Sequence, residues 1–121
     1  MNSINSVHIS GRLGRDVELK YTPNGKAVCK FSLAVEESYR AQGSQDWTQK
    51  TYWIECELWG KQAELLAADS SKGSLVYVAG RLKTQEWQDK QGNKRSKTFV
   101  AVQQGFAASQ SLVTSSRRGR R

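Results

Sequence analysis

A chain of 121 residues is long enough for one domain with its own core but too short for two. It contains neither a long apolar run nor a basic start followed by an apolar stretch, so we expect no membrane-spanning helix and no secretory leader, and a soluble protein inside the cell. The net charge of +8 favours an anionic partner such as nucleic acid, but half of that charge comes from four arginines near the C-terminus, so the folded part is only mildly basic.

The first predicted strand starts at residues 7–9 and contains a bend or bulge at residues 11–16, which include two glycines. It resumes through residues 19–21. Residues 22–25 (TPNG) then form a turn, because proline presets the first corner and Asn-Gly accepts positive φ.

The second predicted strand covers residues 29–35, where alternate apolar side chains give one buried face. Residues 41–50 are polar and contain glycine, so we expect a long hairpin loop there. The third strand then runs from about residue 51 to residue 59.

Residues 61–68 (KQAELLAA) are the only good helix former in the chain, and Gly73 beyond them is suited to stop the helix. Residues 74–83 form the fourth predicted strand. Residues 89–94 are a polar hairpin tip, and residues 97–106 form the fifth strand.

Three strands, one helix and two strands are the element order of the OB-fold. We therefore expect an all-β fold, a five-stranded Greek-key barrel with one helix between strands three and four. Residues 1–108 are assigned to this domain. Residues 109–121 turn to Ser, Thr and Arg, which cannot bury a core, and we expect them to form a disordered tail.

The two cysteines, Cys29 and Cys56, fall on the apolar faces of predicted strands, so we expect two free core thiols rather than a disulfide. His8 is the only histidine, and the cysteines lie far apart in the sequence. We therefore expect neither a metal site nor any other cofactor.

The third predicted strand places aromatic side chains on a polar face. One alternating set is apolar: Tyr52, Ile54, Cys56 and Leu58. The other set combines a threonine and two tryptophans with two carboxylates: Thr51, Trp53, Glu55, Glu57 and Trp59. A face that carries two glutamates does not enter a core, so both tryptophans should be at least partly exposed.

Two further aromatics stand in polar surroundings, Tyr39 in residues 36–40 and Trp87 in the segment EWQ. Exposed aromatics on a sheet, with cations nearby, form a stacking platform for unpaired bases. The nearby cations are Arg40, Lys61, Lys72, Lys83 and Arg95. A single aromatic is more often a core residue and a single lysine more often ordinary surface, so the prediction rests on their combination and on the phase of the strand.

Short segments spread along the chain carry a family resemblance. They are residues 11–16 (GRLGRD), 21–25 (YTPNG), 31–35 (FSLAV), 58–64 (LWGKQAE), 72–74 (KGS) and 87–89 (WQD). With these segments in this order, the sequence resembles the bacterial single-stranded DNA-binding protein family over about residues 4–106.

The resemblance implies an OB-fold that assembles as a homotetramer, or as a homodimer, and binds single-stranded DNA with little sequence preference. It implies roles in DNA replication, repair and recombination. The family's base-stacking aromatics fall on Tyr39, Trp53, Trp59 and Trp87. Its backbone-contacting cations fall on Arg40, Lys61, Lys72, Lys83 and Arg95.

Three features depart from the family pattern. Glu55 and Glu57 lie on the expected binding face, and residues 85–86 place Gln and Glu where the family often has basic residues. These acids should weaken the attraction for phosphates. The sequence ends in SSRRGRR in place of an acidic tip, so we do not expect an acidic tip to recruit partner proteins.

We expect a binding protein without catalysis, because Glu55 and Glu57 have neither a pocket nor a partner histidine in the sequence pattern. The leading hypothesis is sequence-tolerant binding of single-stranded DNA in the cytoplasm at the nucleoid, or in an organellar stroma or matrix. RNA binding is an alternative, since aromatics stack on any base. Another is an assembly subunit that kept the barrel and lost most of its nucleic-acid affinity, which the three acids Glu55, Glu57 and Glu86 favour.

Overall fold

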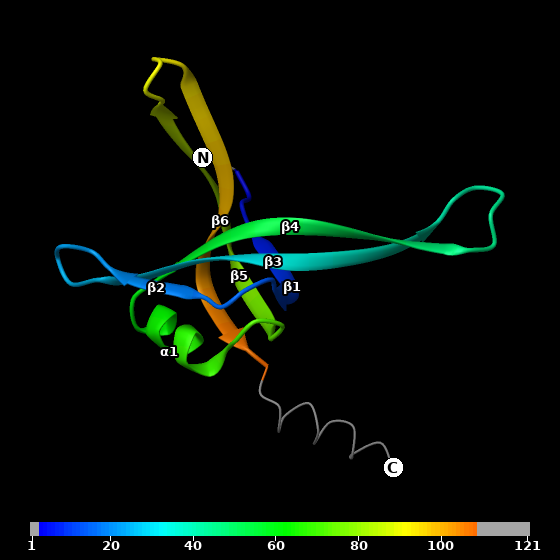
Figure 1. The fold of residues 1–121 in the computed structure, drawn as a ribbon, viewed down its shortest axis with the longest axis horizontal. Helices are drawn as coiled ribbons and strands as arrows, with labels where there is room; N and C mark the ends of the chain where they lie inside the picture. The colour runs from blue at the N-terminus through cyan, green and yellow to red at the C-terminus, as the bar shows by residue number, and fades with distance from the viewer. Residues whose placement is uncertain (1–2, 109–121) are drawn as a thin grey trace, which may run out of the picture.

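The computed structural model describes residues 3–108, which form six strands and one helix (Figure 1). In chain order the elements are β1 (Val7–Leu13), β2 (Glu18–Tyr21), β3 (Ala27–Arg40), β4 (Trp47–Trp59), α1 (Lys61–Asp69), β5 (Leu75–Gln88) and β6 (Lys94–Ala107). Within these residues no helix has the length and apolar character needed to cross a membrane. The predicted tail at residues 109–121 lies outside the described residues.

The strands form a closed barrel. Neighbouring strands follow the order β1-β5-β6-β4-β3-β2, and an additional antiparallel pairing of β1 with β3 closes the sheet. β1 and β2 are the two parts of the predicted first strand, separated at the predicted bend, so they count as one strand of five. In that count α1 lies between the third and fourth strands, and the predicted OB-fold is confirmed.

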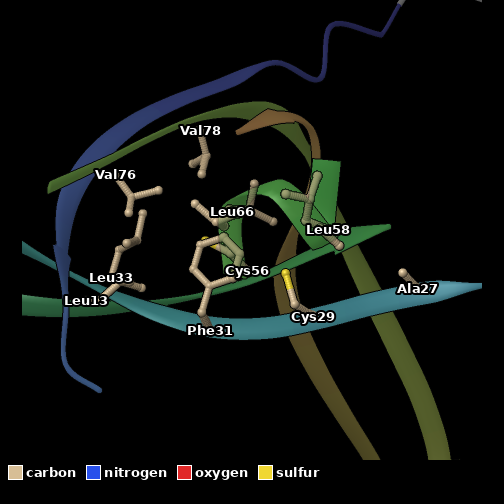
Figure 2. Packing of buried hydrophobic residues seen from close by; sticks show 12 residues of the cluster. Leu13, Ala27, Cys29, Phe31, Leu33, Cys56, Leu58, Leu66, Val76 and Val78 are labelled. Carbon is tan, nitrogen blue, oxygen red and sulfur yellow. The ribbon is translucent and has the colours of Figure 1, made fainter. Parts of the chain in front are cut away.

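Alternate side chains of the barrel strands meet in one core (Figure 2). Ala63 and Leu66 bring α1 into the same cluster. Cys29 and Cys56 are buried free thiols, as the strand pattern predicts. Burial raises the pKa of Cys29 to about 11 and that of Cys56 to about 12, so both thiols stay protonated near neutral pH.

Two long hairpins leave the barrel in different directions, one made of β3 and β4 and the other of β5 and β6 (Figure 1). We call the part of each hairpin that extends beyond the barrel the β3–β4 arm and the β5–β6 arm. Their outer parts are exposed on both faces, from Glu36 outward on β3 and from Arg81 outward on β5. Cross-strand backbone pairing, rather than burial, holds these parts in strand conformation.

The structure corrects several sequence predictions. The loop predicted at 41–50 covers only 41–46, because 47–50 pair with 37–40 as strand. The fourth strand extends beyond its predicted end at residue 83 to Gln88, and the fifth begins at Lys94. Helix α1 ends before Ser70, and Gly73 shapes the following turn, with φ +90°, rather than stopping the helix.

Candidate nucleic-acid interface

The outward face of β4 carries two exposed tryptophans. Trp53 is 58% exposed and Trp59 is 48% exposed, whereas Cys56 and Leu58 on the alternate positions are buried. The strand phase predicted from the sequence is therefore confirmed. Tyr52 belongs to the apolar set but is 39% exposed, because it lies at the base of the β3–β4 arm, where the core ends.

Gly14, in the bend between β1 and β2, makes room for the Trp53 ring. A Cβ atom on Gly14 would lie 2.6 Å from Cζ3 and 2.8 Å from Cη2 of the indole. The ring therefore lies directly against the backbone of the bend. Gly14 fixes where the exposed indole of Trp53 is presented.

Replacing Gly14 with Ala should displace the Trp53 ring and weaken the binding of single-stranded oligothymidine. The loss should stay below the roughly 1–3 kcal/mol of a complete base–aromatic stack, because the indole is moved and not removed. The Gly14 backbone is outside the positive-φ region, so the thermal midpoint should change little. Titration and thermal melting test this, and a large fall in the midpoint with unchanged affinity would assign Gly14 to folding alone.

A hydrogen bond holds Trp59 at the end of β4. Its Nε1–H donates a hydrogen bond of 2.6 Å to Oε1 of Glu57. Gly60, with φ +82°, then turns the chain into α1 and places Lys61 next to the indole, where Lys26 also lines the same hollow. Glu57 therefore positions the Trp59 ring as well as adding negative charge.

Glu55 is paired with a lysine that the sequence analysis did not single out. Lys97 Nζ of β6 lies 2.7 Å from Glu55 Oε2, an approach that depends on the parallel pairing of β4 with β6. The surrounding groove has mixed charge, with these residues lining it: Arg15, Asp16, Glu18, Lys30, Glu55, Glu57 and Lys97. Glu55 thus neutralises a cation on the candidate binding face, beyond the direct repulsion of phosphates that the sequence suggested.

Replacing Glu55 with Gln should tighten the binding of oligothymidine and make it more sensitive to salt. The released Lys97 gains a phosphate partner, and each phosphate neutralised on a single strand adds about 0.7 to the log–log salt slope. The thermal midpoint should barely move, since exposed ion pairs contribute about 0–1 kcal/mol. The matched control is Asp69→Asn at the exposed end of α1, which should change neither quantity; equal effects of the two variants would point to net charge alone.

Trp87 lies on the β5–β6 arm opposite Arg95. The guanidinium of Arg95 is engaged by Asp89, with Nε 3.1 Å from Oδ2. Asp89 also accepts hydrogen bonds from the backbone N–H groups of Asn93 and Gln91, and these bonds, with Arg95, hold the pKa of its carboxyl below the usual range. Arg95 therefore helps to shape the hairpin tip beside Trp87.

The remaining candidate residues are spread over the molecule. Tyr39 lies near the end of the β3–β4 arm, on the face opposite to Trp53. Lys83 lies on β5 across from Phe99. The backbone N–H of Lys72 donates to Asp16 Oδ1 at 2.7 Å, which ties the turn after α1 to the bend that contains Gly14.

The structure thus divides the predicted platform into three groups. The barrel wall holds Trp53, Trp59 and Lys61. Lys72 belongs to this group through the turn after α1, which is hydrogen-bonded to the bend between β1 and β2. The β3–β4 arm carries Tyr39 and Arg40, and the β5–β6 arm carries Lys83, Trp87 and Arg95.

Sequence reasoning missed Trp47, the first residue of β4, which is 68% exposed. The available signal was its spacing of six residues from Trp53, which preserves the alternation of the strand. The polar character of residues 41–50 concealed that signal, because it indicated a loop.

Comparison with known proteins agrees with this geometry. The single-strand binding protein family matches residues 4–106. A solved structure of the Plasmodium falciparum SSB in complex with ssDNA is similar, with a TM-score of 0.78 and 25% sequence identity. The match covers 89% of this chain and 97% of that chain.

Proposed function

The chain belongs to the single-strand binding protein family, and from this premise we propose that it binds single-stranded DNA with little dependence on base sequence. The observation that carries the proposal is the pair of exposed tryptophans, Trp53 and Trp59, on the outward face of one barrel strand. The solved relative whose fold it shares is itself a complex with ssDNA.

Binding combines stacking with phosphate attraction. Unpaired bases stack on Trp53 and Trp59, because every base has a π-face and the interaction tolerates any sequence. Lys26 and Lys61 beside Trp59 contact phosphates electrostatically. The protein acts in this proposal as a binding protein and not as an enzyme.

We propose a homotetramer, built through a homodimer, as the working form. On one side β1 pairs with β5 from Val7 to Arg12, but on the other it reaches β3 only at Arg12 and Leu13, so part of its edge is free to pair with a second copy. Tyr77 and Phe106 form an exposed aromatic stack nearby, with ring centroids 5.5 Å apart. Sedimentation equilibrium over a range of protein concentrations tests the assembly.

The cellular roles that follow are protection of single strands during DNA replication, repair and recombination. The site of action is the cytoplasm at the nucleoid, or the stroma or matrix of an organelle. These roles rest on family membership and on the proposed binding activity.

Titration with matched oligomers tests the binding function. Single-stranded DNA should bind more tightly than duplex of the same length, because the faces of the bases are covered by stacking in a duplex. Tryptophan fluorescence should fall on binding, since Trp53 and Trp59 then lie against bases. Equal affinity for duplex and single strand would contradict the proposal, and tighter binding to the matched RNA would make RNA the ligand.

A further inference from the structure

Trp47 stands at the far end of the β3–β4 arm with most of its indole in water. At 68% exposed, it is the most exposed tryptophan among residues 3–108. A large apolar ring held this far from the core contributes little to folding. Packing in the barrel therefore does not account for this side chain, and we consider a ligand that would contact it.

The register of the arm places Trp47 in line with the two proposed stacking residues. The pairing of β3 with β4 runs without a shift from Val28 and Trp59 to Arg40 and Trp47. Side chains alternate along a strand, so Trp47, Trp53 and Trp59 lie on the same face of β4 at intervals of six residues. The twist of a two-stranded ribbon turns this face gradually about the arm. A DNA strand that follows this face would therefore wind around the arm.

Arg40 lies over the indole from the opposite strand. Its guanidinium carbon is 5.6 Å from the centroid of the Trp47 ring, and the two residues are directly paired across β3 and β4. A cation against one face of an indole holds the ring in place. The other face of the ring is then presented for stacking.

The tip of the arm is an ordered turn. Gly43 has φ +82°, the Ser44 N–H donates to the carbonyl of Ala41, and the Asp46 N–H donates to the Ser44 hydroxyl. The turn thus fixes the approach of the two strands directly before Trp47.

From these observations we propose that Trp47 forms an additional base-stacking site at the tip of the β3–β4 arm, with Arg40 as the residue that positions its ring. The proposal rests on the proposed function, because the ligand is an unpaired base of the same DNA strand that stacks on Trp53. A base is favoured over an apolar protein partner because the ring lies on the same face of β4 as Trp53 and Trp59, and Arg40 covers one side of the ring and leaves a single flat side for stacking.

Titration of Trp47→Ala with oligothymidines of increasing length tests the site. Oligomers too short to reach from Trp53 to the tip should bind as they do to the wild type. Longer oligomers should bind about 5- to 150-fold more weakly to the variant, the range expected for one lost stack. Trp47→Phe should retain most of the affinity, and Leu65→Ala, an exposed apolar residue on α1, should change nothing.

The outcomes separate the two proposals. A wild-type protein that fails to bind any oligothymidine contradicts the proposed function itself. A wild type that binds while Trp47→Ala matches it at every length overturns only the Trp47 site. Thermal melting of each variant confirms that the barrel is folded, since residue 47 lies outside the core.

Arg40→Gln distinguishes positioning of the ring from direct contact with a phosphate. If Arg40 positions the ring, Arg40→Gln should weaken binding of the long oligomers without changing the salt slope. The same substitution should have no further effect in the Trp47→Ala background. Arg40→Lys should restore part of the affinity by keeping a cation over the ring. A slope that falls by about 0.7 in both backgrounds would overturn this role and make Arg40 a phosphate contact.

Discussion

A variant with alanine at both Trp53 and Trp59 should bind single-stranded oligothymidine about 2–6 kcal/mol more weakly than the wild type. Each base–aromatic stack contributes about 1–3 kcal/mol. Six residues of strand separate the two rings by about 20 Å, and their supports differ, since Trp53 lies against Gly14 and Trp59 bonds to Glu57. The two losses should therefore nearly add. Equilibrium titration at fixed salt measures them.

Leu58→Ala is the matched control, because Leu58 lies on the same strand but is buried in the core. It should lower the free energy of unfolding by about 2–5 kcal/mol and leave the affinity of the folded protein unchanged. The double tryptophan variant should show the opposite behaviour, with weak binding and a normal thermal midpoint. A double variant that unfolds while Leu58→Ala stays stable would mean that the faces of β4 are reversed.

The barrel and the faces of β4 were predictable from the sequence because both depend on local alternation. Two glutamates at 55 and 57 identify the outward face whatever the partners of the strand are. The helix was equally local, since a short run of helix formers follows Gly60. These features fix the fold class and the exposure of Trp53 and Trp59.

The arms were not predictable in the same way, because nothing buried marks them. Residues 47–50 are polar apart from Trp47, and local composition does not distinguish a loop from a strand that is exposed on both faces. Only the pairing with 37–40 settles the conformation. For that reason the local pattern does not predict that Trp47 belongs to the candidate site.

The contacts that tune the site depend on pairings between distant segments. Gly14 meets Trp53 because the bend after β1 lies beside β4, and Lys97 meets Glu55 because β6 runs parallel to β4. No periodicity in the sequence specifies either neighbour. Local sequence patterns therefore predict which side chains are exposed on the outward face, but not which residues position or neutralise them.

Gly80→Ala should be the most damaging small substitution in the barrel, lowering the free energy of unfolding by about 3 kcal/mol or more. A Cβ atom on Gly80 would overlap the carbonyl oxygen of Ala101 and lie 2.9 Å from the Ala101 carbonyl carbon and from Val102 Cα. These are backbone atoms of the paired strand β6, so no side chain is available to move aside. The register of β5 on β6 also shifts between Ala79 and Gly80, at the base of the β5–β6 arm. Urea denaturation followed by circular dichroism measures the loss.

Gly105→Ala is the control for the general effect of adding a methyl group to a barrel glycine. Its Cβ would meet only side-chain atoms, Val102 Cγ1 at 3.2 Å and Leu58 Cδ2 at 3.4 Å, and these need to give by only a few tenths of an ångström. The loss at Gly105 should therefore be clearly smaller than the loss at Gly80. Equal losses would show that a general cost of adding a methyl group to the barrel, and not the close approach of β5 to β6, decides the effect. A Gly80→Ala protein as stable as the wild type would mean that the two strands lie farther apart at the base of the arm that carries Trp87.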